Sequence, residues 1–205
     1  MQRFASALVL SLAVVAAPLA AQGARETAVV AGGCFWGVDA VFKHVKGVTS
    51  VVSGYAGGAK GSADYETVSG GQTGHAESVQ ITYDPKVVSY ETLLKVFFSV
   101  AHGPTELNRQ GPDVGTQYRS AIFFSNTAQQ EAATSYIAKL KQVKAYKRPI
   151  VTLVAPLAGF FAAEAYHQDY LAQHTTQAYI VYNDLPKLDA LKKVFPELWS
   201  EPVRK

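Results

Sequence analysis

Hydrophobic and polar residues follow one another along the chain in short blocks that predict alternating strands and helices. The apolar run at residues 27–31 is typical of a buried strand, and the turn Gly32-Gly33 comes shortly after it. Beyond this turn, apolar residues recur at the spacing of one helix face: Val38, Val41, Phe42 and Val45. Residues 48–53 form the next apolar block, which predicts a second strand.

The rest of the chain continues this alternation. Residues 74–84 alternate between apolar and polar, which predicts a strand with one apolar face, and Asp84-Pro85 then turns the chain. Ser89 is the expected N-cap of a helix whose apolar residues extend to Val100. The remaining expected elements are a strand at 118–124, a helix from a Thr127–Gln130 capping box to residue 143, a strand at 150–154 and a helix within 164–171.

The order of the main elements is strand, helix, strand, strand, helix, strand. This order resembles a split βαβ arrangement, in which helices cover one face of a mainly antiparallel sheet. We therefore expect an α+β fold, a two-layer ferredoxin-like α/β plait with an extra C-terminal helix and coil. No internal repeat or linker interrupts the pattern, so residues 24–205 are expected to form a single domain.

The N-terminal residues differ in kind from the rest. Arg3 is followed by an apolar run at residues 5–17 and then by Pro18 and small residues up to Ala24. This layout is typical of a secretory signal peptide, so residues 1–23 are expected to be removed, with cleavage between residues 20 and 24. We expect an exported, periplasmic protein that is free of the membrane after processing. A retained N-terminal anchor is the alternative.

Composition narrows the classes of protein to consider. The chain has 205 residues, of which 48% are hydrophobic, and this is enough for one compact core. The net charge is +3 and there is no basic stripe with interleaved aromatic residues, so nucleic acid is not an expected partner. The five histidines include no helical i, i+4 pair and there is a single cysteine, so no metal site is expected.

The only cysteine, Cys34, lies at the predicted strand-to-helix turn. It cannot form a disulfide within the chain, so it is either a buried, inert residue or a reactive thiol. The free amides and the positive dipole end of a helix stabilise an anion at such a turn. The position therefore predicts a lowered thiol pKa and a nucleophilic thiolate.

Glu77 shares the apolar face of its predicted strand with Val79, Ile81 and Tyr83. A carboxyl group that faces the core is expected to have a raised pKa and to stay protonated near neutrality, as a functional acid would. The alternative is a residue at the end of a strand that reaches solvent.

The residues around the cysteine, Gly33-Cys34-Phe35-Trp36-Gly37, closely resemble the signature of the class A peptide-methionine sulfoxide reductases. Between residues 28 and 182, further blocks resemble this family in its order: Gly54-Tyr55-x-Gly57-Gly58, Tyr65-Glu66, Gly74-His75-Ala76-Glu77, Tyr83-Asp84-Pro85, Asp113-x-Gly115-Thr116-Gln117-Tyr118-Arg119-Ser120 and Ala163-Glu164-x-Tyr166-His167-Gln168-x-Tyr170-Leu171. The resemblance implies an oxidoreductase that reduces the S epimer of methionine sulfoxide and so repairs oxidative damage.

The resemblance also implies which residues form the site. Cys34 would attack the sulfoxide sulfur and become a sulfenic acid, while Phe35 and Trp36 would form an apolar cage for the substrate's methyl group. The remaining roles concern the oxygen and the reacting sulfur: Glu77 would give a proton to the oxygen, Tyr65 and Tyr118 would hydrogen-bond it, and Asp113 would lie near the sulfur.

Two departures from the family pattern affect these expectations. Many members carry a further cysteine that resolves the sulfenic acid, and this chain has none. We therefore expect no cofactor but an external thiol reductant, such as thioredoxin, glutaredoxin or a small-molecule thiol, acting on a monomer that takes free or protein-bound methionine sulfoxide. The second departure is Gly103, which stands where the family usually has aspartate.

Two other classes of function remain open at this stage. Cys34 could be the nucleophile of a cysteine hydrolase, with His75, His102 or His167 as its base. The chain could also bind oxidised peptides without reacting with them.

Overall fold

The computed structural model describes residues 25–202. The predicted signal peptide at residues 1–23 lies outside the described residues. Within residues 25–202, no helix has the length and the apolar character that crossing a membrane requires.

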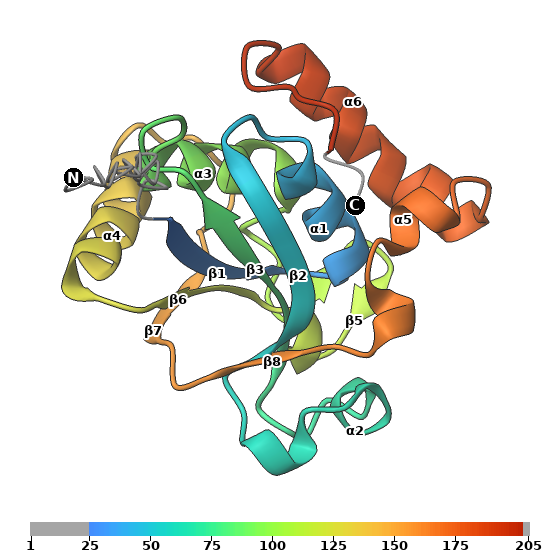
Figure 1. The fold of residues 1–205 in the computed structure, drawn as a ribbon. Helices are drawn as coiled ribbons and strands as arrows, with labels where there is room; N and C mark the ends of the chain where they lie inside the picture. The colour runs from blue at the N-terminus through green and yellow to red at the C-terminus, as the bar shows by residue number, and fades with distance from the viewer. Residues whose placement is uncertain (1–24, 203–205) are drawn as a thin grey trace, which may run out of the picture.

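A six-stranded sheet forms the centre of the fold (Figure 1). In spatial order its strands are β7 (Leu153–Pro156), β6 (Ser120–Phe124), β1 (Glu26–Gly32), β3 (Ala76–Tyr83), β2 (Val48–Ala56) and β8 (Phe160–Ala162). All neighbouring strands run antiparallel except β6 and β7, which run parallel. The central strand β1 is buried from Ala28 onward, which explains why its sequence is a continuous apolar run.

Helices pack on one face of this sheet and cover its larger apolar side chains. They are α1 (Phe35–Lys43), α3 (Tyr90–Val96) with the π-helical turn η2 (Phe97–Ala101), and α4 (Thr127–Gln142). Val30, Ile81 and Ile122 from the sheet share one core with Phe42 of α1 and Leu94 of α3. Burial of these apolar side chains between the sheet and the helices is the main favourable contribution to the stability of the fold. The architecture is α+β, as predicted.

The other face of the sheet carries small side chains and a thinner cover. Its buried residues form a separate cluster under Leu157 and Phe160: Val29, Ala31, Ala56, Ala76, Ala121 and Phe123. The segment that leads from β7 to β8 therefore covers the face that the helices leave free.

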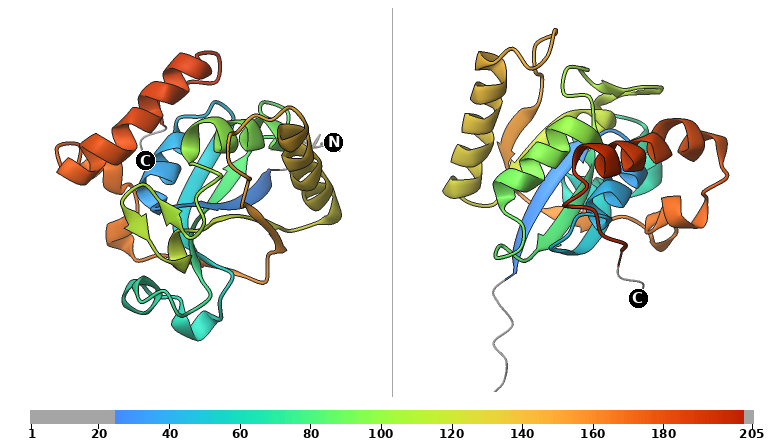
Figure 2. Two further views of the ribbon diagram at one scale, coloured as in Figure 1. Left: turned by 180° about the vertical axis from the view of Figure 1, so that it is seen from behind. Right: turned by 90° about the horizontal axis from the view of Figure 1, so that it is seen from above.

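The C-terminal part of the chain packs beside α1 at the edge of the molecule (Figure 2). It comprises the short α5 (Tyr170–Gln173), the π-helical turn η5 (Ile180–Asp184) and α6 (Leu185–Val194). Both views show the two-stranded hairpin of β4 (Arg109–Gln110) and β5 (Asp113–Val114) near the N-terminal end of α1, on the side of this C-terminal segment. The N-terminus of α1 is thus the place where chain segments distant in sequence meet.

Most of the predicted elements are correct in kind, and three predictions need correction. The N-cap of α4 is Asn126, whose side chain accepts from the Gln129 amide at 2.9 Å, so the predicted capping box starting at Thr127 does not form. The strand predicted at 150–154 lies at Leu153–Pro156 instead.

The helix predicted within residues 164–171 is the third correction. The chain forms a 3-10 turn, η4 (Ala165–His167), and then the four-residue α5. Asp169 separates the two with φ of 56°, a left-handed conformation that no helix interior contains. The aromatic residues of this segment therefore do not lie along one side of a continuous helix, although their spacing suggested it.

Candidate active site

Cys34 stands between β1 and α1, where it is the N-cap residue of the helix. Gly33 before it has φ of 90°, and a Cβ atom at that position would lie 2.5 Å from Cβ of Gln110, so only glycine fits. The cysteine is 8% exposed. The turn thus holds the thiol just below the surface, at the end of the central strand and the start of a core helix.

The expectation that this turn lowers the thiol pKa is wrong. Burial raises the pKa of Cys34 well above its usual value, and the nearby carboxyl groups of Glu77 and Asp184 raise it further. The backbone N–H of Trp36 and the ammonium group of Lys187 lower the pKa, but by less. Burial outweighs the helix terminus, so the resting group at neutral pH is the thiol.

Glu77 lies on β3 with its side chain toward the start of α1. It is 3% exposed, and its Oε2 atom accepts a hydrogen bond from the backbone N–H of Phe35 at 3.1 Å. Burial raises the pKa of this carboxyl to about 8, with a further rise from Asp113, and the Phe35 N–H only partly offsets the rise. The predicted core-facing, protonated acid is confirmed, and the alternative of a solvent-exposed strand end is wrong.

Two tyrosines reach the same region from elements on either side. Tyr65 begins α2 (Tyr65–Ser69) and Tyr118 ends the 3-10 turn η3 (Thr116–Tyr118); both are half-buried. The pKa of each hydroxyl is raised, first by burial and next by the negative charge of Glu77, and Cys34 adds to both. The structure therefore brings both predicted oxygen-binding phenols within electrostatic range of the acid and the thiol.

Asp113 of β5 is half-buried and accepts a short hydrogen bond from the hydroxyl of Tyr179. Burial raises its pKa, while Tyr179 and Lys187 act in the opposite direction. Because Asp113 also raises the pKa of Glu77, the two carboxyl groups favour a state with at least one proton between them.

Phe35 and Trp36 have different environments. Phe35 is 1% exposed and packs in the core, with its ring centroid 5.1 Å from that of His167. Trp36 is half-buried, lies flat on Tyr170 at 3.7 Å between centroids, and donates its Nε1–H to Nδ1 of His167 at 3.2 Å. The indole is therefore held in a fixed orientation at the start of α1, whereas the phenyl ring is part of the core.

The three histidines proposed as bases for a hydrolase are engaged elsewhere. His75 bonds to Gly58 N–H and lies 3.0 Å from the carbonyl of Ala59, and His102 bonds to the carbonyl of Phe97 and to Ser120. His167 bonds to Trp36. Among the described residues none of these imidazoles hydrogen-bonds to Cys34. No group of three metal-ligating side chains occurs within residues 25–202 either.

Comparison with known proteins decides the family. The family model described as peptide methionine sulfoxide reductase matches residues 26–198. This chain belongs to that family. Its activity is the reduction of methionine sulfoxide, and its role is the repair of oxidised proteins.

Individual relatives agree with this membership. A peptide methionine sulfoxide reductase of Mesorhizobium japonicum is 61% identical over 176 residues, which cover 86% of this chain and 90% of that protein. The relative in Chromobacterium violaceum is 49% identical over 84% of this chain and 98% of its own length.

Solved structures of the family have the same fold. The reduced form of Mxr1 from Saccharomyces cerevisiae gives a TM-score of 0.68 at 32% identity, over 75% of this chain and 87% of that one. Methionine sulfoxide reductase A of Corynebacterium diphtheriae gives 0.66 at 34% identity, over 77% and 78%.

Several residues that pack around the predicted site were given no role in it from the sequence, and His167 was considered only as the base of a hydrolase. Glu164 accepts from the Tyr65 backbone N–H at 2.8 Å and from the Tyr55 hydroxyl at 2.9 Å, so it fixes the start of α2. His167 and Tyr170 hold Trp36, and Tyr179 holds Asp113. The sequence feature that could have indicated these residues is the aromatic block at residues 160–174. It contains polar residues at positions that would be apolar in a simple core helix.

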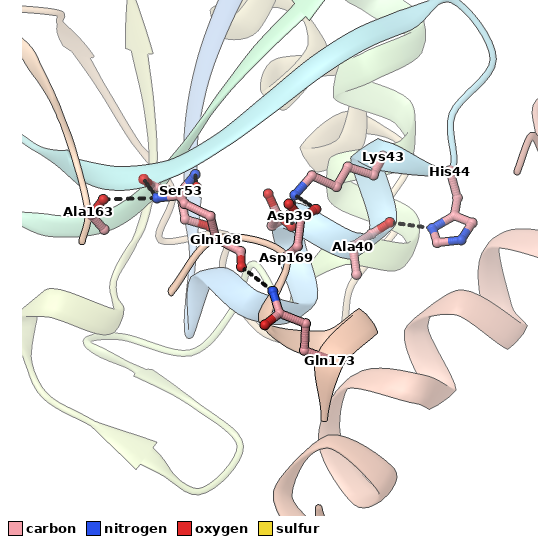
Figure 3. Close-up of polar contacts among 9 residues, drawn as sticks. All are labelled: Asp39, Ala40, Lys43, His44, Ser53, Ala163, Gln168, Asp169 and Gln173. Carbon is pink, nitrogen blue, oxygen red and sulfur yellow. Dashed lines mark hydrogen bonds and ion pairs between the residues drawn. The ribbon is translucent and has the colours of Figure 1, made fainter. Parts of the chain in front are cut away.

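A polar network fastens this aromatic block to the sheet and to α1 (Figure 3). The Gln168 amide accepts from the Ser53 N–H at 3.0 Å and donates to the Ser53 carbonyl at 2.9 Å. Lys43 of α1 bridges the buried Asp39 at 2.7 Å and Asp169 at 2.6 Å. These two sets of interactions, made by Gln168 and by Lys43, are called the polar clamps below. They fix the segment in the way that an apolar face fixes a regular amphipathic helix.

A cavity of about 160 Å³ opens beside Cys34. Its walls come from η2 and the loop after it, from the β4–β5 hairpin, and from η5 and α6, and they include His102, Gly103, Asp113, Tyr179 and Lys187. Of the predicted site residues, only Cys34 and Asp113 line it. A larger groove of about 1100 Å³, which contains Lys43 and Gln168, touches none of them.

Proposed function

We propose that the reductase acts on the S epimer of methionine sulfoxide, free or in oxidised proteins, with Cys34 as nucleophile and Glu77 as acid. The observation that carries this proposal is the buried carboxyl of Glu77. It has a pKa of about 8 and lies against the amide that follows Cys34 in the chain. A carboxylic acid that is still protonated at neutral pH beside a thiol is what oxygen transfer from a sulfoxide requires.

The atoms balance without any cofactor. The Cys34 sulfur attacks the sulfoxide sulfur while Glu77 protonates the oxygen, and Tyr65 and Tyr118 donate hydrogen bonds to it. The oxygen ends on Cys34 as a sulfenic acid and methionine leaves. Cys34 loses one proton when it becomes the attacking thiolate, and Glu77 takes up one proton after giving its own, so the carboxyl is neutral again after each turnover.

Substrate recognition follows from the aromatic wall. Trp36 follows Cys34 by two residues, stacks flat on Tyr170 and is only half-buried, so its indole offers an apolar surface to which the substrate's methyl group could bind. Because the oxygen and the methyl group bind to different walls, only one configuration at sulfur presents both correctly to Cys34.

The test is methionine release from each separated epimer in the presence of a thiol. We expect release from the S epimer alone, and no release in Cys34→Ser. Release from the R epimer at the same rate would contradict the proposal. A binder would be indifferent to Cys34→Ser in a binding assay, and a hydrolase would instead release product from acyl substrates.

We further propose that an external thiol regenerates Cys34, because the chain has a single cysteine. Thioredoxin, glutaredoxin and small-molecule thiols all have the required chemistry. Steady turnover with no added thiol would contradict this.

Three broader proposals complete the account. The strand order β6-β1-β3-β2 within the sheet supports a ferredoxin-like plait.

The sequence of residues 1–23 supports export to the periplasm, and N-terminal sequencing of the mature protein tests this proposal. A monomer is expected because the substrate is one side chain, and light scattering tests it.

A further inference from the structure

We propose that the cavity beside Cys34 is the entry site of the regenerating thiol, and that it admits a small thiol whose sulfur is carried on a narrow, unbranched arm. This inference rests on the proposed sulfenic acid at Cys34. It adds a second, separate approach to the same sulfur, next to the one that the methionine sulfoxide uses.

The walls of the cavity distinguish it from the substrate site. Cys34 and Asp113 line it, but none of Phe35, Trp36, Tyr65, Glu77 and Tyr118 does. Displacement at sulfur places the attacking atom and the leaving atom on opposite sides of the sulfur. A sulfenic oxygen held by the acid and the two phenols therefore leaves room for attack only from a direction that these residues do not occupy, and the cavity offers such a direction.

The size of the cavity limits the class of thiol. Its volume of about 160 Å³ is well below the roughly 300–1,000 Å³ of pockets that take drug-sized ligands. A mixed disulfide with a protein cysteine would also bring a second backbone to within about 7 Å of the Cys34 Cα atom. Cys34 is only 8% exposed, so the site favours a small thiol, which brings no second protein backbone so close to the buried sulfur.

The chemistry of the walls suits a thiolate. Lys187 lines the cavity, and its Nζ atom lies against the first turn of α1, because a Cβ atom on Gly37 would be 2.6 Å from it. Asp184 pairs with this ammonium group at 2.9 Å and holds it in place. A cation fixed in the wall of this cavity favours the ionised form of an incoming thiol, which is the form that attacks.

The step balances as follows. The thiolate RS⁻ attacks Cys34 Sγ, the S–O bond of the sulfenic acid breaks, and the oxygen leaves as hydroxide, which takes up one proton to become water; this gives a mixed disulfide between Cys34 and R. A second RSH attacks the outer sulfur and releases RSSR and the Cys34 thiol. Two thiols are oxidised to one disulfide, and the sulfenic acid is reduced by the same two electrons.

Gly103 keeps this cavity open. It lines the wall without a side chain, and its backbone is clasped by the Gln110 amide through bonds of 2.9 and 2.8 Å. An added Cβ atom would meet its nearest neighbour, Gln110 Oε1, at 3.5 Å, which is ordinary contact. A larger residue can therefore be placed here without disturbing the backbone, so this position gives a direct way to narrow the cavity.

The experiment separates the two half-reactions in the full chain. Each protein is first reacted with the S epimer in the absence of thiol, and released methionine is counted per protein. The sulfenic acid form is then mixed with 2-mercaptoethanol, and its loss is followed by quenched mass spectrometry. Gly103→Val is the test variant. Gly61→Val is the matched control, because a Cβ atom on Gly61 meets nothing within 4 Å and Gly61 lies away from the cavity.

We expect Gly103→Val to release methionine like the parent and to react with 2-mercaptoethanol at least tenfold more slowly, while Gly61→Val matches the parent in both steps. Asn183→Leu narrows the same cavity from η5 and is expected to act in the same direction, which keeps the test informative if Gly103→Val does not fold. Unchanged thiol rates in both cavity variants would overturn the inference. Absence of methionine release in the parent would instead overturn the proposed function on which it rests.

Discussion

The two halves of the active site are built in different ways. Cys34, Phe35 and Glu77 belong to the central strands and the first core helix, and they are nearly inaccessible to solvent. The wall formed by His167, Tyr170 and their neighbours lies on short turns that are held by polar clamps. The comparison teaches that the reacting groups depend on the core of the fold, whereas the groups that would hold the substrate depend on a few specific hydrogen bonds.

The two halves differ most clearly in the pKa values of their ionisable groups. At the core-built half, burial raises the pKa of both Cys34 and Glu77, so both groups carry protons at rest. At the wall, burial also acts to raise the pKa of Glu164, but the hydrogen bonds that this carboxylate accepts, among them those from Tyr65 and Tyr55, outweigh burial and leave the pKa lowered. The same residue type is thus protonated in one half and ionised in the other at neutral pH.

Glu77→Gln tests the half of the site that is built on the core, and it is expected to have the largest effect on activity. General acids typically contribute about 10²- to 10⁴-fold, so kcat/KM at pH 7 should fall by at least about 100-fold. Glu66→Gln, an exposed acid in α2, is the matched control and should be unchanged. An unchanged rate in Glu77→Gln would remove Glu77 from the mechanism.

The pH profile sharpens the same claim. Activity requires a Cys34 thiolate and a protonated Glu77, so kcat/KM of the parent should rise with pH and level off near pH 8, where the acid begins to lose its proton. In Glu77→Gln the residual rate should continue to rise through pH 8, because only the ionisation of Cys34 remains. Identical profiles in the two proteins would show that the carboxyl is not the group that titrates.

Glu77→Gln should lose activity without losing stability relative to the parent. The raised pKa means that the folded state takes up a proton at Glu77, which costs stability as the pH rises above the ordinary value of 4.5. At roughly 1.4 kcal/mol per pH unit, this cost is on the order of 3 kcal/mol at pH 7, and glutamine removes it. Urea unfolding should therefore find Glu77→Gln at least as stable as the parent at pH 7, and a marked loss of stability would contradict the inferred state of the acid.

Trp36→Ala tests the wall and is expected to have the next largest effect. Loss of the stacked indole removes apolar contact worth about 1–2 kcal/mol, so KM should rise about tenfold while methionine formation at saturating substrate is retained. Trp199→Ala, at the other tryptophan of the chain, is the control. A loss confined to kcat would place Trp36 in the chemical step instead.

Gln168→Leu tests the clamp beneath the wall and should have the smallest effect on activity. The buried Ser53 N–H would lose its partner, which should lower the free energy of unfolding by about 1–3 kcal/mol and raise KM a few-fold. Gln173→Leu, whose amide only donates to the Gln168 carbonyl at the surface, should change neither. Equal effects of the two substitutions would mean that the clamp does not position the wall.

The sequence could predict the core-built half because its signals are local. The alternation around Glu77 placed the carboxyl on the buried face, and the two glycines before Cys34 indicated the turn. The thiol pKa was predicted in the wrong direction, since a helix terminus is visible in the sequence whereas the depth of burial depends on the whole fold. The pairs Trp36–Tyr170 and Asp113–Tyr179 join residues far apart in the chain, and no periodic pattern reveals them.

The most direct test of the central claim is the mass of the protein after a single turnover without reductant, using the separated S and R epimers of methionine sulfoxide. The account predicts that Cys34 gains one oxygen, trapped by a sulfenic-acid reagent, with the S epimer only, together with one methionine per protein. No change in mass with either epimer would contradict it.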